Sequence, residues 1–575
     1  MRTSIIRQFA ALMIVSVMSI GSVHATFALG TDRSQGRSAM VASQHELASQ
    51  IGSDIMRRGG NAVDAAIAVG FALAVVYPEA GNIGGGGFMV IRKKNGESVA
   101  IDYREKAPAA AHRDMYVDKD GNLIRGEGSS TLGYRAAGVP GVAAGFELAF
   151  KKHGSGKVKW ADLVEPSRRL ATEGYILSHR LAELFKGYQN NLSKYEDTKR
   201  IFLNGGKFFD GGDRLIQTDL GLTLARIRDK GAAGFYTGKT AELIAADMKA
   251  NNGLMTLEDL KNYKAVERTP LRGTYRGHEI ITMPPPSSGG IVLLQVLNAL
   301  ENYDIRGMGF GSAEKTHLYT EASRRAFADR AEYMADPDFA EVPVNKLIDK
   351  AYAKSRMAQV DPKKASASKD VRFGDVSGKE PMETTHYTVV GPDGDVVSNT
   401  YTINDLYGSA VTAKGTGVLL NNEMDDFAAR PGQPNLFGLV QGERNKVEGG
   451  KRPLSSMTPT IVLKKDGTPW FAVGARGGPR IISAVMQVVI NVIDHDMDIQ
   501  EAIDAPRFHQ QWLPDEIMFE RNGLSPDTKR ILEVFGHKFT SRPGNIASAT
   551  GIMIDDKGIR TGAIDPRSDG AAIGY

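Results

Sequence analysis

Residues 384–390 read Thr-Thr-His-Tyr-Thr-Val-Val, and this stretch decides the fold. Its β-branched and aromatic residues predict a strand, and the turn sequence Gly-Pro-Asp-Gly at 391–394 joins it to a second β-rich run at 395–403. The preceding residues 362–383 are polar, contain Phe373 as their single aromatic residue, and predict a mobile surface segment. A strand that opens with a hydroxyl group therefore follows directly on a flexible segment.

This arrangement suits self-processing of the chain. The hydroxyl of Thr384 could attack the carbonyl carbon of Glu383 and form an ester, which water would hydrolyse to leave Thr384 as a new N-terminus. The freed α-amino group, with an ordinary pKa of about 7.7–8.0, could then serve as general base near neutral pH. His386 lies two residues along the same strand, at about 6.6 Å, which is too far for direct proton transfer, so we expect a structural role for it. A threonine at the start of a strand is ordinary by itself, so the rest of the chain must support this interpretation.

The remaining pattern alternates blocks of helix and hairpin. Residues 141–345 are mostly helical in pattern, as at 240–250 and 312–334. A second hairpin is expected at 458–473, followed by an apolar helix near 481–493. Such blocks predict a layered α+β fold without internal repeats.

Near the N-terminus, residues 43–76 begin with a polar cap and continue as an Ala-rich apolar run that predicts one buried helix. Four glycines at 84–87 precede an apolar strand at 88–91 and indicate close approach of the backbone. This glycine run lacks the Lys-Ser/Thr ending of a phosphate-binding loop, which argues against nucleotide binding.

Composition limits the possible chemistry. The 575 residues contain no cysteine, which excludes disulfides, cysteine nucleophiles and Cys-ligated metals, so a nucleophile must be an oxygen or nitrogen group. The 42% of hydrophobic residues suffice for one large domain or two closely packed ones. A formal net charge of +4 is near neutral for this length and gives no sign of a nucleic-acid partner.

Residues 1–25 have the pattern of a secretory signal peptide. Arg2 and Arg7 precede an apolar run at 9–23, which is shorter than the roughly 20 residues of a membrane-spanning helix. Small residues place cleavage after Ala25, with Ala28 as a second candidate; an uncleaved membrane anchor is the alternative. Because no later stretch is long and apolar enough to cross a bilayer, we expect a soluble, periplasmic or secreted mature protein without a membrane span.

Several ordered blocks around this strand closely resemble the γ-glutamyltranspeptidase family, and its bacterial periplasmic members most of all. The resemblance covers nearly the whole chain after residue 25. Besides residues 384–387, the matching blocks are GNAVDAA at 60–66, DYRE at 102–105, GVPG at 138–141, TYTIN at 400–404, LNNEMDDF at 420–427, KRPLSSMTPT at 451–460, APRFH at 505–509 and DPR at 565–567.

The resemblance implies the N-terminal-nucleophile hydrolase fold, an αββα sandwich of two central sheets between helical layers. It also implies that one precursor is cut between Glu383 and Thr384. Residues 26–383 would form the large subunit and residues 384–575 the small catalytic subunit, together making a heterodimer.

Carried over by position, the resemblance makes Thr384 the nucleophile and Thr402 the hydroxyl that orients it. Gly477 and Gly478 would donate backbone N–H groups to the oxyanion, a contribution of about 3–4 kcal/mol per donor in other acyl-transfer enzymes. The residues expected to hold the α-carboxylate of a γ-glutamyl group are Arg104, Ser455 and Ser456; those expected to hold its α-ammonium are Asn404, Glu423 and Asp426.

Two positions depart from the bacterial pattern. The oxyanion stretch contains Arg476 and Pro479, which add a positive charge and remove one N–H donor, so rate and acceptor preference are in doubt. Phe437 stands where a lid tyrosine is common, within a family-like lid at 431–439, and the missing hydroxyl could loosen closure.

The implied activity is transfer of the γ-glutamyl group of glutathione or related γ-glutamyl amides to water, amino acids or peptides. No metal or organic cofactor is expected, because the nucleophile, base and oxyanion donors are all protein groups. Rival interpretations with the same fold are a cephalosporin (glutaryl) acylase and a γ-polyglutamate hydrolase. A rival of another class is a non-catalytic binding protein that keeps the amino-acid pocket. The sequence leaves the preferred acceptor, the ratio of hydrolysis to transfer and the physiological substrate open.

Overall fold

The computed structural model describes residues 34–374, 385–430, 433, 435, 436, 439 and 442–575. Glu383, Thr384, Phe437 and the leader at 1–25 lie outside the described residues.

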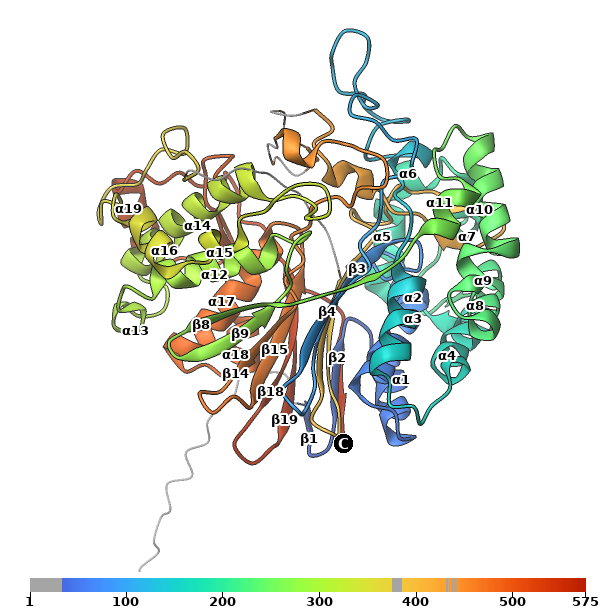
Figure 1. Ribbon diagram of the computed structural model, residues 1–575, viewed down its shortest axis with the longest axis horizontal. Coiled ribbons are helices and arrows are strands. Elements are labelled where there is room, and N and C mark those ends of the chain that lie inside the picture. The colour runs from blue at the N-terminus through green and yellow to red at the C-terminus, as the bar shows by residue number, and fades with distance from the viewer. Residues whose placement is uncertain (1–33, 375–384, 431–432, 434, 437–438, 440–441) are drawn as a thin grey trace, which may run out of the picture. The chain divides into compact units, whose positions relative to one another are not determined.

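Two sheets pack face to face with helices on both outer sides, as Figure 1 shows. This is the expected α+β αββα sandwich. The sheet on the left of the view has the strand order β1 (Ser34–Gly36), β19 (Arg560–Ile564), β18 (Ser548–Ile554), β15 (Pro469–Arg476), β14 (Thr460–Leu463), β9 (His278–Thr282), β8 (Leu271–Tyr275). The second sheet has the order β20 (Ala571–Gly574), β2 (Met40–Ser43), β10 (Thr385–Val390), β11 (Val396–Thr402), β3 (Gly86–Arg92), β4 (Ser98–Asp102), β7 (Val266–Arg268).

Each sheet has its own helical layer. On the side of the second sheet lie α1 (Glu46–Arg57), α2 (Ala62–Val76), α3 (Val142–His153), α4 (Trp160–Glu173) and α8 (Thr218–Lys230). On the side of the first sheet lie α12 (Gly289–Leu300), α14 (Ala313–Tyr333), α16 (Lys350–Met357), α17 (Arg480–His495) and α18 (Ile499–Asp504). The remaining helices are α5 (His179–Gly187), α6 (Gln189–Leu192), α7 (Glu196–Phe202), α9 (Ala233–Tyr236), α10 (Gly238–Ala250), α11 (Leu257–Asn262), α13 (Ile305–Met308), α15 (Val344–Leu347) and α19 (Pro526–Val534). Short two-stranded pairs are β5 (Tyr175–Ile176) with β6 (Arg214–Leu215), β12 (Thr412–Ala413) with β13 (Val418–Leu419), and β16 (Phe508–His509) with β17 (Met518–Phe519).

Most sequence expectations hold, with two corrections. The single helix expected over 43–76 is wrong, because the chain breaks at Gly59-Gly60 into α1 and α2, and the side chain of Asn61 caps α2. The described part of the segment expected to be mobile, residues 362–374, is anchored: Ser368 is buried and its backbone N–H donates to Asp515 at 2.8 Å.

Strand β10 is buried on both faces, which explains its composition. Tyr387 and Val389 point to the core that includes α2, whereas Val390 belongs to the core between the sheets. His386 lies between Thr400 and Thr388, with its Nδ1 2.8 Å and its Nε2 3.0 Å from their hydroxyl oxygens. Burial lowers the pKa of His386 to about 3, so the imidazole is neutral and both ring nitrogens are used within the sheet. The geometry supports the structural role expected for this histidine.

The close packing of the two sheets at His386 predicts the effect of an added methyl group. A Cβ atom on Gly474 of β15 would lie 2.4 Å from the His386 ring, so Gly474→Ala should destabilise the fold by about 1–3 kcal/mol through overpacking. Thermal unfolding of the Thr384→Ala background would measure this, with Gly187→Ala as control because a Cβ there meets no atom within 4 Å. Equal unfolding midpoints for the two variants would contradict this account of the inter-sheet packing.

Candidate active site

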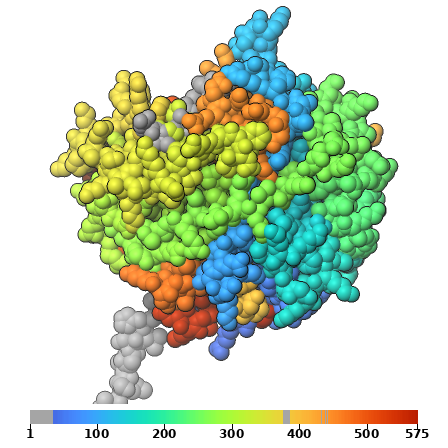
Figure 2. All heavy atoms as spheres, viewed as in Figure 1, coloured from blue at the N-terminus to red at the C-terminus, as the bar shows by residue number. Residues whose placement is uncertain are grey.

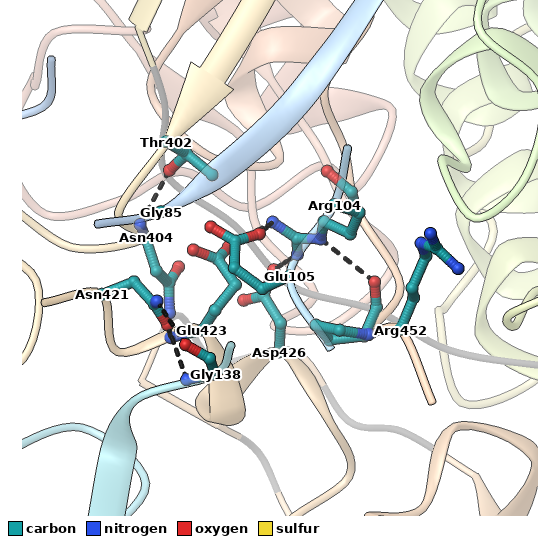
Figure 3. A network of polar contacts seen from close by, with 12 residues as sticks. Gly85, Arg104, Glu105, Gly138, Thr402, Asn404, Asn421, Glu423, Asp426 and Arg452 are labelled. Carbon is teal, nitrogen blue, oxygen red and sulfur yellow. Dashed lines mark hydrogen bonds and ion pairs between the residues drawn. The ribbon is translucent and has the colours of Figure 1, made fainter. Parts of the chain in front are cut away.

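Strand direction brings the expected site residues to one edge of the second sheet. Strand β3 begins at Gly86, which pairs with Thr402 at the end of β11, and β4 ends at Asp102 opposite Phe88. Strands β11 and β4 both run antiparallel to β3, so the residues that follow β11 and β4 meet at the edge where β3 begins. This convergence places Arg104, two residues after β4, near Asn404, two residues after β11 (Figure 3).

Thr402 ends β11 next to the start of β10, the strand predicted to follow the nucleophile. Thr385, the first residue of β10, pairs with Tyr401, so Thr402 is the next residue along β11 towards this edge. Its Oγ1 accepts a 2.7 Å hydrogen bond from the backbone N–H of Asn404. Asn404 has φ of 72°, a left-handed conformation that turns the chain sharply after the strand. Thr402 therefore lies where β10 begins, and its expected role towards residue 384 stays a prediction.

Arg104 is the centre of a buried charge cluster. Its guanidinium donates to Glu423 and Asp426, both in the 3₁₀ turn η3 (Glu423–Asp426), and lies 3.5 Å from Glu105. It also donates to the backbone carbonyls of Pro453 at 3.1 Å and Leu454 at 3.0 Å. Arg104 thus joins three segments of the chain, as Figure 3 shows for its carboxylate partners.

Several acceptor oxygens of this cluster have no donor. Among the described residues, none donates to Asn404 Oδ1, Glu423 Oε2 or Asp426 Oδ1, although all three atoms are buried. Buried acceptors are normally satisfied, and an ammonium group offers three donors. The side chains expected to hold an α-ammonium therefore present an acceptor set that matches one.

One guanidinium faces three carboxyl groups, and the pKa values reflect the imbalance. Burial raises the pKa of Glu423 and Asp426 well above the ordinary range, and the nearby Arg104 charge opposes this only in part. Burial likewise raises the pKa of Glu105 to about 7, against the lowering influence of Arg104. An incoming cation would remove the imbalance, because a positive charge favours the ionised carboxylates.

Sequence reasoning missed Glu105, Asn421 and Arg452. The amide of Asn421 donates to the carbonyls of Gly84 and Gly138 and accepts from the N–H groups of Gly138 and Glu423, so it holds η3 against the glycine-rich loop. Arg452 lies 3.4 Å from Asp102 and steadies the loop whose carbonyls accept from Arg104. The adjacent motifs DYRE, LNNE and KRPLSS contained these residues, but nothing in their spacing assigned them contacts.

Ser455 and Ser456 directly follow Leu454 in the chain, and both are buried. Ser456 Oγ accepts from Arg330 Nη2 at 2.7 Å, and Arg330 of α14 is a second guanidinium that the sequence did not suggest. Ser455 Oγ accepts from the Met457 N–H at 3.2 Å. The two serines therefore follow directly on the loop whose carbonyls accept from Arg104, and each hydroxyl oxygen accepts a hydrogen bond.

Gly477 and Gly478 form the turn between β15 and α17. Their φ values of 126° and 73° require glycine, and a Cβ on Gly477 would lie 2.6 Å from Ala547. Neither backbone N–H has an acceptor among the described residues. Gly477 also lines a cavity with Asp405, the neighbour of Asn404, which places this turn beside the same site.

Part of the expected lid is described. The Leu436 N–H donates to Asp425 Oδ2 at 3.3 Å, and the Asn435 N–H donates to the Leu439 carbonyl at 3.0 Å. Asp425, Asn435 and Leu436 line a small cavity with residues 123–125, and Figure 2 shows the two chain regions against one another at the top of the molecule. The expected departure at Phe437 lies outside the described residues.

Among the described residues, the candidate metal ligands lie away from the Arg104 cluster. Within the described part of the chain, the candidate cation cluster is His317, Glu321 and His537, on the far helical layer. Its two imidazoles bond to each other at 2.8 Å, and Arg324 and Arg325 neutralise Glu321. No helix among the described residues is both long and apolar enough to span a membrane.

Known proteins share this architecture. A family model described as gamma-glutamyltranspeptidase matches residues 48–575. The "Glutathione hydrolase proenzyme" of Escherichia coli (strain K12) is 49% identical over 543 residues, covering 94% of this chain and 92% of that protein. A cephalosporin acylase from Bacillus halodurans superposes with a TM-score of 0.84 at 25% identity, covering 95% of this chain and 97% of that one. A Helicobacter pylori γ-glutamyltranspeptidase chain superposes with a TM-score of 0.56 at 49% identity, covering 58% of this chain and 94% of that one.

The αββα sandwich shared with these enzymes defines the class of N-terminal-nucleophile hydrolases. Within that class, the match over nearly the whole sequence assigns the chain more narrowly. The chain belongs to the γ-glutamyltranspeptidase family and is an enzyme with hydrolase and transferase chemistry.

The raised pKa of Glu105 predicts a pH-dependent stability. The folded state holds the proton more tightly than the unfolded state, so stability falls as pH rises from about 4.5 to about 7 and the full penalty remains above pH 7. Glu105→Gln removes this penalty, so its unfolding midpoint relative to the parent should rise between pH 5 and pH 8, by up to about 3 kcal/mol in free energy. Thermal unfolding of the Thr384→Ala background would test it. A pH-independent difference, as expected for the exposed control Glu97→Gln, would show that Glu105 is ionised throughout.

Proposed function

We propose that this chain is a self-processing γ-glutamyltranspeptidase and glutathione hydrolase. The observation that carries the proposal is the set of three buried acceptor oxygens, on Asn404, Glu423 and Asp426, placed next to Arg104 and Thr402. Such a set suits the amino-acid head of a γ-glutamyl group. The names of similar proteins, a glutathione hydrolase proenzyme and a γ-glutamyltranspeptidase, support the same substrate class.

The head of the substrate would rearrange the charge cluster. Its ammonium would take the open oxygens of Asn404, Glu423 and Asp426, and its carboxylate would compete for the guanidinium of Arg104. Ser455 and Ser456 would donate their hydroxyls to the same carboxylate. Binding would therefore expand the contact of one guanidinium with two carboxyl groups into a five-charge arrangement in which each substrate charge faces the opposite sign, which offsets part of the cost of desolvating the substrate.

The chemistry would then proceed in two steps. Thr384 adds to the γ-carbonyl, Thr402 orients its hydroxyl, and the N–H groups of Gly477 and Gly478 stabilise the oxyanion. The amine departs with a proton and leaves an ester on Thr384. Water or the amine of an amino acid or peptide attacks this ester, releasing glutamate or a new γ-glutamyl product and restoring the threonine. In this proposal, residues of the chain itself supply the nucleophile, the orienting hydroxyl and the oxyanion donors.

Maturation would precede this reaction. We propose cleavage between Glu383 and Thr384, giving a heterodimer of residues 26–383 and 384–575 after removal of residues 1–25 on export to the periplasm. The printed description "proenzyme" of the similar E. coli protein supports processing. The match to the H. pylori chain covers 94% of that chain but only 58% of this sequence. That chain therefore corresponds in extent to a part of this sequence about as long as the proposed large subunit.

An acylase for glutaryl substrates is the alternative with structural support, because a cephalosporin acylase shares the fold. A glutaryl group has the terminal carboxylate but no α-ammonium. It would leave the acceptor oxygens of Asn404, Glu423 and Asp426 buried without donors, which is costly. The cluster therefore favours the γ-glutamyl group.

Self-processing predicts two chains in the purified exported protein. An intact-mass spectrum under denaturing conditions should show a small chain that begins at Thr384 and a large chain that begins near residue 26. Thr384→Ala should remain a single chain, because it lacks the attacking hydroxyl. An uncut wild-type chain would remove Thr384 as a working nucleophile and favour a binding protein instead.

The acceptor set predicts acyl-group selectivity. Asp426→Asn weakens one charge-assisted contact to the ammonium, so kcat/KM for γ-glutamyl-p-nitroanilide should fall about 10- to 100-fold relative to that for glutaryl-p-nitroanilide. Asp425→Asn is the matched control, since Asp425 is bound by Ser130 and has no contact with Arg104 in the described structure; its ratio of the two rates should stay near that of the parent. If Asp426→Asn lowered both rates equally, this carboxylate would not read the ammonium.

A further inference from the structure

The helix that follows the glycine turn begins with an arginine, at a position where a helix does not favour one. Arg480 is the first residue of α17, and the N-terminus of a helix carries the positive end of its dipole. A cation there gains nothing from the helix, whereas an acid would be stabilised. The reason for an arginine at this position lies instead in its contact with the preceding turn.

Arg480 holds the peptide group between the two glycines of the turn. Its Nε donates to the carbonyl oxygen of Gly477 at 2.8 Å, and its Nη1 donates to the carbonyl oxygen of Asn545 at 3.4 Å. The Gly477–Gly478 bond is trans, so its C=O and N–H groups point in opposite directions. Because the guanidinium fixes the Gly477 carbonyl, it also fixes the Gly478 N–H, which points to the side of the peptide away from Arg480.

The flanks of the turn leave this peptide as its adjustable part. Before it, Arg476 pairs with Ser548 at the end of β15. After it, the ring of Pro479 fixes φ at −54° where α17 begins. The two glycines have φ of 126° and 73°, and glycine adopts other values at little cost, so their shared peptide can rotate with little change in either flank. The bond from Arg480 favours one of its two orientations.

This orientation matters to the proposed reaction, in which the Gly478 N–H donates to the oxyanion. A half-turn of the peptide would replace that donor with the Gly477 carbonyl, whose partial negative charge would then face the oxyanion. In the observed orientation the Gly478 N–H has no backbone acceptor among the described residues. The bond from Arg480 therefore keeps a donor, and not an acceptor, on this side of the peptide.

We propose that Arg480 is a positioning residue for the oxyanion site: by holding the Gly477 carbonyl, it keeps the Gly478 N–H directed at the reacting γ-carbonyl. The proposal rests on the proposed function and adds to it a residue that acts through the backbone without touching the substrate. Two glycines supply the donors, and a side chain three residues beyond Gly477 supplies the constraint that the glycines lack.

Kinetics of the mature enzyme with γ-glutamyl-p-nitroanilide test this role, with rates normalised to the processed fraction measured by intact mass. Arg480→Met removes the donor and keeps an apolar stem. It should lower kcat about 10- to 100-fold with KM nearly unchanged, because an oxyanion donor acts mainly in the transition state. Arg480→Lys keeps a donor and should retain part of the rate.

Arg560→Met is the matched control. Arg560 Nη1 also donates to the carbonyl of a glycine with positive φ, Gly558, at 2.6 Å. This contact lies beyond the end of β18 that is remote from Ser548, so the kcat of the control variant should stay near that of the parent.

Two inhibitors separate the oxyanion site from the pocket for the amino-acid head. L-Glutamate uses the head alone, and its Ki should change by less than about twofold in Arg480→Met. In the γ-boronic acid analogue of glutamate, the hydroxyl oxygen of Thr384 adds to boron, and the anionic tetrahedral adduct places an oxygen at the oxyanion position. Its Ki should rise by the factor by which kcat/KM falls. Equal changes in both Ki values, or an unchanged boronate Ki, would overturn the positioning role.

A crystal structure gives a readout that depends neither on maturation nor on activity. In the Thr384→Ala background, Arg480→Met should show the Gly477–Gly478 peptide rotated or in two orientations, whereas Thr384→Ala alone should show one. A single, unchanged orientation in the double variant would overturn the proposal and leave the proposed function standing. Failure of the wild-type enzyme to cleave γ-glutamyl-p-nitroanilide would instead overturn the proposed function itself.

Discussion

The contact between Arg104 and the two acids of η3 is the constraint on which this site depends. Burying a guanidinium costs several kcal/mol unless charge and hydrogen bonds compensate it. Here the compensation comes from Glu423, Asp426 and two backbone carbonyls, so the chain must bring three distant segments together before the arginine can be buried. The site can therefore exist only in the completed fold.

Strand order provides that convergence. Strands β4 and β11 flank β3 and both end at the edge where β3 begins, so Arg104 and Asn404 leave the sheet side by side. Asn421 then ties η3 to the glycine loop ahead of β3 through four backbone contacts. The rigid elements thus position the polar groups of the site.

Much of the fold was predictable because its signals are local. The strand at residues 385–390 and the helix at 313–333 follow from composition and caps, and the structure places them there. The break between α1 and α2 was missed because the apolar pattern continues on both sides of Gly59-Gly60, where the backbone alone turns. Among the described residues carried over by resemblance, Arg104 contacts Glu423 and Asp426, whereas the roles assigned to the whole set stay predictions. Glu105 and Arg330 were missed because their contacts depend on tertiary neighbours that no spacing reveals.

The unliganded charge balance also bears on how substrate is recognised. Glu423, Asp426 and Glu105 outnumber Arg104, and burial raises the pKa of each of these carboxyl groups, which favours their protonated forms in the absence of another cation. A substrate ammonium brings that charge itself, so its arrival should displace protons, and recognition becomes an exchange of one cation for another. A ligand without the ammonium leaves the protons in place and gains nothing from the exchange. Under the proposed function, this exchange would favour a γ-glutamyl group over a glutaryl group before any contact with the γ-carbonyl.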